Sequence, residues 1–205
     1  MENSISKSLF AFITITTIVV MFSFFVWVFP SFFYNNELAK KTTAQPYAAL
    51  QLAGRDVYMA QGCVSCHTQM VRNIEAERKR YGRPNKMEDD VYEFTFLWSS
   101  QRTGPDLTNI GLKYTPDWHK QHLINPQSVV PNSIMPQYPW LFEKPLNSDH
   151  VVAAMEAMKK LGVPYTDNQI AKAKDEVKGK TEGEALVSYL MSLGVDTHND
   201  VGGLQ

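Results

Sequence analysis

Two cysteines and a histidine that are close in the chain have the types and spacing to carry chemistry. Cys63, Cys66 and His67 form a C-x-x-C-H motif, and the chain holds no other cysteine. This spacing is typical of c-type haem attachment, in which two thiols bond to the vinyl groups of one porphyrin and the adjacent histidine supplies an axial nitrogen to the iron. The motif therefore predicts one covalently bound haem c, with both cysteines as attachment sites and His67 as an iron ligand.

Two other uses of the cysteine pair compete with haem attachment. A redox-active C-x-x-C pair usually follows a strand in a thioredoxin-like unit, and the sequence around the motif shows no such unit. A zinc site needs further ligands, for which only His119 and His122, far along the chain, could be offered. Haem attachment is the interpretation that the sequence favours.

Met135 is the candidate for the second axial ligand of the iron. It lies in a stretch, 130–145, that holds four prolines, and such stiff backbone can hold a thioether on the far side of a haem. Histidine plus methionine ligation is common in electron-transfer cytochromes. His119 and His122 are the rivals for this position.

The segment Gly-Pro-Asp-Leu at 104–107 is the second informative stretch. A metal-bound histidine needs an acceptor for its other ring nitrogen. The carbonyl of Pro105 can serve, because the proline ring makes the loop rigid. We expect this carbonyl to accept a hydrogen bond from Nδ1 of His67.

Four further side chains are candidates for contact with the haem. Arg72 and Arg102 could pair with the haem propionates, although both could equally be solvated arginines. Tyr114 and Trp118 could pack on the macrocycle or hydrogen-bond to it, with ordinary core packing as the alternative.

A long apolar segment precedes these residues. Residues 9–29 carry no charge over 21 positions, and as a helix they would rise roughly 32 Å, about the thickness of the hydrocarbon core of a bilayer. The run is longer than the apolar region of a cleaved signal peptide, and as a core helix it would need a larger protein around it. We expect an uncleaved single-span anchor. Lys7 before it and Lys40 and Lys41 after it do not fix its orientation.

The composition and the pattern of the remaining residues favour a mainly α protein. With 20 basic and 21 acidic residues among 205, the balance argues against a nucleic-acid binder. Helices are expected at 47–61, 116–124, 148–160 and 182–193, and capping-box patterns begin at Thr166 and Thr181. The charged stretch 72–91 is expected to be an exposed insertion or loop, and 92–98 is the one candidate strand.

These motifs together resemble a class I cytochrome c domain. The resemblance rests on the haem motif at 63–67, the Gly-Pro-Asp-Leu segment, Met135 followed by proline, and the closing sequence ALVSYL. In that fold the helix before the haem motif crosses the last helix. The contact positions implied here are Gly54 and Tyr58 on the first helix, and Leu186 and Tyr189 on the last.

The whole chain resembles the mono-haem c subunit, subunit II, of cbb3-type cytochrome c oxidase. The resemblance is carried by the N-terminal anchor, GCVSCHTQMVR, a long insertion, SQRTGPDLTNIGLKY, WHKQHLINP and VVPNSIMPQYPWL. It implies a fold with a single N-terminal transmembrane helix and a class I cytochrome c domain with a long insertion. The implied organisation is an N-terminus and anchor at 1–34, a linker at 35–45, a cytochrome domain at 46–195 and a tail at 196–205.

The resemblance also implies a function. The complex reduces O₂ to water and pumps protons, while this subunit carries electrons and lacks the catalytic centre. Its haem would receive electrons from the dihaem cytochrome c subunit or another c-type partner and pass them to haem b of the catalytic haem–copper subunit. A calcium ion is shared near the subunit interface in this family. The segment 99–103 could face it, but no ligand is assigned.

Haem attachment sets the expected orientation in the membrane. Bacteria attach c-type haem on the outer face of the cytoplasmic (inner) membrane, so the haem domain is expected to be periplasmic and the N-terminus cytoplasmic, with membrane lipid around the anchor. Three other functions stay open: the small cytochrome c subunit of nitric oxide reductase, a haem-based sensor, and a membrane-tethered shuttle. A sensor would require an open or labile sixth position on the iron.

Overall fold

The computed structural model describes residues 2–33 and 44–195, which belong to two units. The expected linker at 35–45 lies outside the described residues except for its last two positions. The lysines at 40 and 41 and the tail at 196–205 lie outside them entirely. Helices dominate both units, and the described ranges contain no strand, only an isolated bridge between Pro145 and Thr181. The expected mainly α fold is confirmed.

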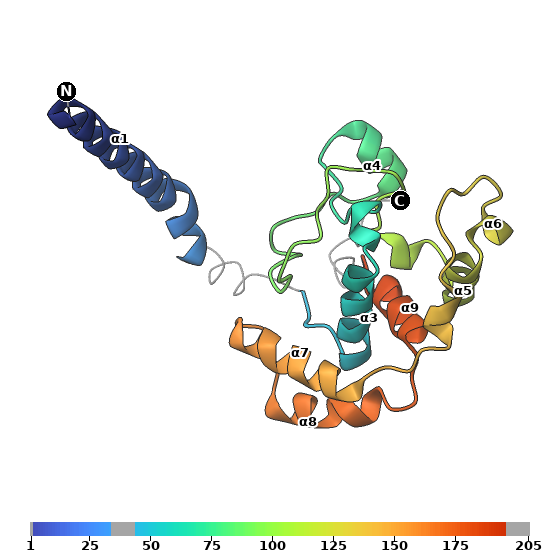
Figure 1. Ribbon diagram of the computed structural model, residues 1–205. Coiled ribbons are helices and arrows are strands. Elements are labelled where there is room, and N and C mark those ends of the chain that lie inside the picture. Colours follow the sequence, from blue (N-terminus) through green and yellow to red (C-terminus); the bar gives the residue numbers. More distant parts are fainter. Residues whose placement is uncertain (1, 34–43, 196–205) are drawn as a thin grey trace. The chain divides into compact units, whose positions relative to one another are not determined.

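The N-terminal unit is one apolar helix. It runs through α1 (Glu2–Ser23) and the π-helical turn η1 (Phe24–Val28) to residue 33 (Figure 1). The segment Lys7–Phe33 has 27 residues, a mean hydropathy of 2.5 and no burial within the protein. By length and composition it can cross a membrane, as expected.

Hydroxyl groups within this helix are satisfied by its own backbone. Thr14 donates to the carbonyl of Phe10 and Thr17 to that of Ile13, each at 2.8 Å. An unpaired hydroxyl would be costly in hydrocarbon. These bonds therefore suit a helix surrounded by lipid.

The second unit is built on the crossing of α3 (Ala49–Ala60) and α9 (Glu182–Ser192), seen in Figure 1. The backbones meet at Gly54, where an added Cβ would lie 2.7 Å from Cβ of Tyr189. The rings of Tyr58 and Tyr189 lie 5.7 Å apart, and Leu186 is buried in the same core cluster. The contact positions expected from the cytochrome resemblance are thus confirmed.

The other helices pack around this crossing. They are η2 (Cys63–Ser65), α4 (Glu75–Tyr81), η3 (Ile110–Leu112), α5 (Pro116–Ile124), α6 (Pro126–Val129), η4 (Pro139–Phe142), α7 (Ser148–Lys160) and α8 (Asp167–Glu176). Two clusters of buried side chains form the core. The first core cluster joins α7 and α8 to α3. The second core cluster joins α3 and α9 to α5, and it includes the loop residues Leu97 and Leu107. Figure 1 shows α7 and α8 side by side and α5 and α6 on another side of the crossing.

Local sequence signals set several of the helix ends. The side chain of Thr115 accepts a hydrogen bond from the backbone N–H of Trp118, with Pro116 in the first turn of α5. Thr166 and Thr181 begin the expected capping boxes of α8 and α9.

The charged segment 72–91 is more ordered than the sequence predicts. The expectation of an exposed insertion or loop is wrong in part, because the segment contains α4 and buries Glu77 to 6% exposure. Paired charges drive this burial, since Glu77 receives hydrogen bonds from Arg72 and Arg102. A charged sequence can fold inward when its carboxylates find such partners.

The strand considered for 92–98 does not form within the described residues. Instead the segment lies against α3 through a buried ion pair between Arg55 and Glu93, with Nε 2.7 Å from Oε2. Arg55 also donates to the carbonyl of Thr95 at 2.7 Å. The second bond takes up the backbone carbonyl of Thr95, which a neighbouring strand would otherwise pair with.

Candidate functional site

A tight turn at the end of α3 holds the cysteine motif. Gly62 follows the helix with φ +70°, in the left-handed region that favours glycine. The backbone N–H of His67 then donates to the carbonyl of Cys63 at 2.9 Å. The turn therefore brings the two thiols and the imidazole together directly after a helix fixed in the core.

The Gly-Pro-Asp-Leu loop holds the imidazole of His67. Nδ1 of His67 lies 2.9 Å from the carbonyl oxygen of Pro105, the contact expected from the sequence. Gly104 packs on the ring face, because an added Cβ would lie 2.6 Å from Nδ1 and 2.8 Å from Nε2. The hydroxyl of Tyr58 donates to the His67 carbonyl at 2.7 Å. With Nδ1 bonded to a carbonyl, Nε2 is the ring atom left to bind a metal.

Burial favours the uncharged forms of His67 and Cys63. It lowers the pKa of His67, an effect that the Pro105 carbonyl partly offsets. Burial also raises the pKa of the Cys63 thiol to about 11. A neutral imidazole is the form that binds metals, whereas a redox-active thiol needs a lowered pKa. The site thus favours metal ligation over thiol exchange.

An apolar wall lies beside the motif. The second core cluster is flanked by half-buried side chains from separate parts of the chain: Cys63, Val64, Tyr114, Met135 and Tyr138. Behind them are Leu107, Ile110, Leu123, Leu141 and Leu190, all buried. Met135 and Cys63 thus pack against the same cluster, as expected for a ligand and an attachment site of one haem.

The loop that carries Met135 is tied to α5 and α6. The N–H of Tyr138 donates to the carbonyl of Leu123 at 2.8 Å, and the Gln127 amide donates to the carbonyl of Ser133 at 3.2 Å. Ser133 in turn accepts from the N–H of Met135 at 3.2 Å. These bonds, together with the prolines, hold the backbone of the loop from which the Met135 side chain projects.

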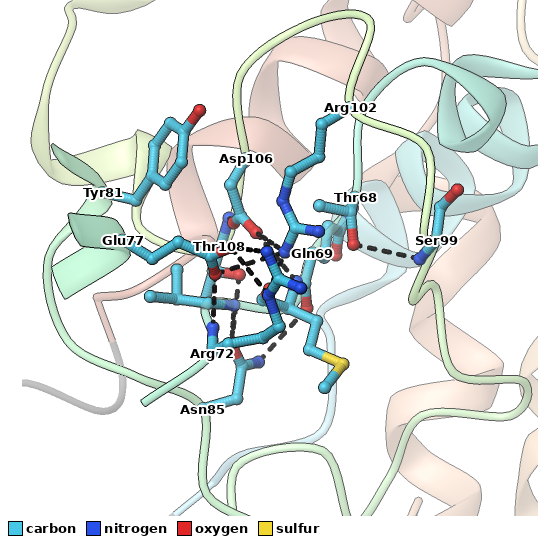
Figure 2. Close-up of polar contacts among 12 residues, drawn as sticks. Thr68, Gln69, Arg72, Glu77, Tyr81, Asn85, Ser99, Arg102, Asp106 and Thr108 are labelled. Carbon is cyan, nitrogen blue, oxygen red and sulfur yellow. Dashed lines mark hydrogen bonds and ion pairs between the residues drawn. The ribbon is translucent and has the colours of Figure 1, made fainter. Parts of the chain in front are cut away.

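Both arginines expected to meet haem propionates converge on Glu77, as Figure 2 shows. Arg72 donates to it from Nε and from the backbone N–H at 2.7 Å each, and Arg102 from Nη2 at 3.3 Å. The hydrogen bond from Arg72 is the main cause that lowers the pKa of Glu77. Nε of Arg102 is buried without a partner among the described residues, so Arg102 keeps one donor for a further acceptor.

Sequence reasoning missed the polar residues that brace this region. Asp106 accepts from the N–H groups of Thr108 and Met70, at 2.8 and 3.2 Å. Asn85 accepts from the N–H of Val71 at 2.8 Å (Figure 2). Nothing in the charged insertion marks Asn85 for this role, whereas Asp106 stood next to Pro105 and could have been singled out.

Three aromatic rings stack in a row that begins just before α5 and continues along the helix. Tyr114 and Trp118 have centroids 3.7 Å apart, and Trp118 and His122 have centroids 4.7 Å apart, with interplanar angles of 8° and 11°. Tyr114 also packs on the second core cluster. The expected contact of Tyr114 and Trp118 with a macrocycle stays a prediction.

The residues present fit a covalently held haem better than a zinc ion. In the described part of the chain, no three histidine, cysteine or acidic side chains are grouped to hold a metal ion. A haem requires less from the protein: two thiols, an imidazole with Nε2 available, a thioether and an apolar wall. The chain supplies each of these in one region.

The comparisons with known proteins support this interpretation. A family model described as "Cytochrome C oxidase, mono-heme subunit/FixO" matches residues 2–186. The match takes in both the apolar helix and the unit that holds the cysteine motif. It does not favour the nitric oxide reductase or sensor alternatives. A search of curated proteins gave no significant match.

Proposed function

Since the chain belongs to the family of mono-haem subunits of cytochrome c oxidase, FixO, we propose that it is the electron-transfer subunit of a cbb3-type haem–copper oxidase. It relays electrons through one haem c from a c-type cytochrome to haem b of the catalytic subunit. The observation that carries this proposal is the hydrogen bond from His67 to the Pro105 carbonyl, next to the cysteine pair. It orients the imidazole as a ligand to iron.

The bound haem would supply an iron that alternates between the ferrous and ferric states. Cys63 and Cys66 would tether it, and His67 would present Nε2 to it while the Pro105 carbonyl holds Nδ1. Met135 offers a thioether from a braced loop, and the apolar wall excludes water from the ligands. If His67 and Met135 both bound the iron, the group would suit electron transfer rather than O₂ binding.

The polar side chains around the pocket have supporting roles in this proposal. Arg102, whose Nε is buried without a partner in the described chain, would pair with a haem propionate. Arg72, held by Glu77, adds positive charge to the same edge. Tyr114 and Trp118, whose rings are stacked on each other, would pack on the macrocycle.

The apolar helix anchors the subunit in the bacterial cytoplasmic membrane. The proposed organisation is a cytoplasmic N-terminus and anchor at 1–34, a linker at 35–45, a periplasmic cytochrome domain at 46–195 and a tail at 196–205. The support is the helix at Lys7–Phe33, the one helix of the described residues that can cross a membrane, and the family match. The proposed partners are the catalytic haem–copper subunit and the dihaem cytochrome c subunit, with a calcium ion shared near the interface.

Purification from membranes in mild detergent tests the proposal. We expect the chain to stain for covalent haem and to copurify with a haem–copper subunit and a dihaem cytochrome, identified by mass. A haem-bearing chain that elutes alone would contradict the subunit role. Carbon monoxide binding to the reduced chain would instead favour a sensor.

The sixth ligand is tested by replacing Met135 with leucine. We expect Met135→Leu to keep the haem but to lose the near-infrared band of ferric haem with methionine ligation. Met87→Leu is the matched control, because Met87 is 45% exposed in the charged insertion. An unchanged spectrum in Met135→Leu would exclude the assignment.

A further inference from the structure

Two short segments of the chain run side by side at the imidazole of His67. They are residues 66–70, which end the cysteine motif and follow it, and the Gly-Pro-Asp-Leu loop at 104–107. Three contacts of 2.9 Å join them: the Gly104 N–H with the Cys66 carbonyl, Nδ1 of His67 with the Pro105 carbonyl, and the Leu107 N–H with the Thr68 carbonyl. Asp106 joins the same two segments through its side chain.

The carboxylate of Asp106 accepts two backbone hydrogen bonds. Oδ1 accepts from the N–H of Thr108, just past its own loop, at 2.8 Å. Oδ2 accepts from the N–H of Met70, in the segment that follows His67, at 3.2 Å. One side chain therefore ties the loop to the segment that carries the iron ligand.

Burial strengthens the hold of this carboxylate. The Asp106 side chain has 0% exposure, and its Oδ2 lies 4.0 Å from Nη2 of Arg102, within the polar cluster of Figure 2. The same Nη2 donates to the Met70 carbonyl at 2.9 Å. Hydrogen bonds to a charged acceptor are stronger than neutral ones, and a buried group that loses its partner carries the full cost of its desolvation. Met70 is thus held at its N–H by Asp106 and at its carbonyl by Arg102.

The peptide group between Pro105 and Asp106 couples this anchor to His67. Its carbonyl, from Pro105, faces Nδ1 of His67, and its nitrogen belongs to Asp106. A peptide group is planar and turns as one unit, and proline has no N–H with which to anchor itself. The direction of the carbonyl is therefore set by the anchors on its two sides, the Gly104 N–H and the Asp106 carboxylate.

We propose that Asp106 is a positioning residue for the iron ligand: its carboxylate fixes the peptide whose carbonyl orients His67, and through that contact it sets how readily the haem takes up an electron. This inference rests on the proposed function. An acceptor on Nδ1 raises the basicity of a ligand histidine, which favours the ferric state, and a buried negative charge favours it too. Loss of the Asp106 carboxylate should therefore shift the equilibrium with a redox mediator toward ferrous haem, roughly two- to tenfold, the range of one hydrogen bond.

Asp106→Asn removes this anchor with the smallest change of shape. The amide of asparagine has one acceptor oxygen, so it can bond to the N–H of Thr108 or of Met70 but leaves the other facing an NH₂ group. Asp89→Asn is the matched control. Asp89 also accepts a backbone N–H, from Lys86 at 2.8 Å, and also pairs with a guanidinium, but within the charged insertion.

Two readouts on the full-length, haem-bearing chain report on the ligand rather than on folding. With ¹⁵N-labelled histidine in the reduced, diamagnetic chain, the Nδ1–H resonance of His67 should move to the position of a weaker hydrogen bond in Asp106→Asn. A redox titration should shift toward ferrous haem in the same variant. Asp89→Asn should keep the wild-type resonance and the wild-type potential. The proposal would be overturned if Asp106→Asn kept either of them, even with a loss of stability.

A measurement on the unsubstituted chain covers the case in which Asp106→Asn does not fold. The amide N–H of Met70 should be protected from hydrogen exchange in the haem-bearing chain, because it bonds to a buried carboxylate. Exchange of this amide at the rate of an exposed one would overturn this inference alone. A chain purified without covalent haem would overturn the proposed function and this inference together.

Discussion

A methyl group at position 104 is expected to displace the imidazole of His67. An alanine Cβ there would lie 2.6 Å from Nδ1 and 2.8 Å from Nε2, and nearer still to Cε1. Non-bonded carbon contacts are comfortable at about 3.5–4 Å, so the ring or the loop must move by roughly 1 Å. A shift of this size lengthens the 2.9 Å contact between Nδ1 and the Pro105 carbonyl beyond hydrogen-bond distance.

The cost of Gly104→Ala follows from these two effects. Overpacking a tight site costs about 1–3 kcal/mol, and loss of the hydrogen bond costs about 0.5–1.5 kcal/mol. We expect the free energy of unfolding to fall by roughly 2–4 kcal/mol, measured by urea unfolding of the full-length chain followed through haem absorbance. The reduction potential should change as well, since the hydrogen bond to Pro105 sets the basicity of the ligand.

Gly179→Ala provides the comparison for Gly104→Ala. Gly179 has φ +74° and no atoms within 4 Å of an added Cβ, so alanine there costs about 1–2 kcal/mol of backbone strain away from His67. The haem spectrum should stay unchanged in Gly179→Ala. The reasoning would be refuted if Gly104→Ala had both the stability and the spectrum of the wild type.

Three further predictions concern the fold around the site. Arg55→Met should lower the free energy of unfolding by about 3–5 kcal/mol in the same urea assay, because it leaves the carboxylate of Glu93 buried without its cation. Adding Glu93→Leu to Arg55→Met should recover much of that loss, and a double variant as unstable as Arg55→Met would contradict the explanation. Thr181→Ala should cost about 1 kcal/mol in thermal unfolding, since the Thr181 hydroxyl caps α9; an unchanged Tm would count against it. Burial raises the pKa of Asp90 to about 7, so its contribution to stability is full below the unfolded pKa near 4 and is lost as the pH rises through 7. Asp90→Asn should therefore become more stable relative to the wild type as the pH rises from 4 to 8, and a difference independent of pH would argue against it.

The parts of the structure that the sequence predicted depend on local signals. Thr115 and Pro116 mark the start of α5, and the capping boxes mark α8 and α9, because cap and first turn are adjacent in the chain. The contact of His67 with Pro105 was also predictable, since a histidine ligand requires an acceptor and a rigid carbonyl meets that need.

The parts that the sequence did not predict depend on pairing between distant charges. Glu77 is buried with two partners, the nearby Arg72 and also Arg102, which lies 25 positions later. Glu93 is held by Arg55, 38 positions earlier, and this contact replaces the strand considered for 92–98. A charged side chain shows in the sequence only that it is charged, so its partner and its burial become visible only in the fold.

The central claim is that Cys63 and Cys66 attach one haem to this chain. Mass spectrometry of the denatured chain purified from membranes tests it directly, with Cys63→Ser and Cys66→Ser as matched variants. The account predicts a wild-type mass increased by one haem that acid and organic solvent do not remove, and the doubly substituted chain should lack that increase. A wild-type chain with the mass of its amino acids alone would contradict the account.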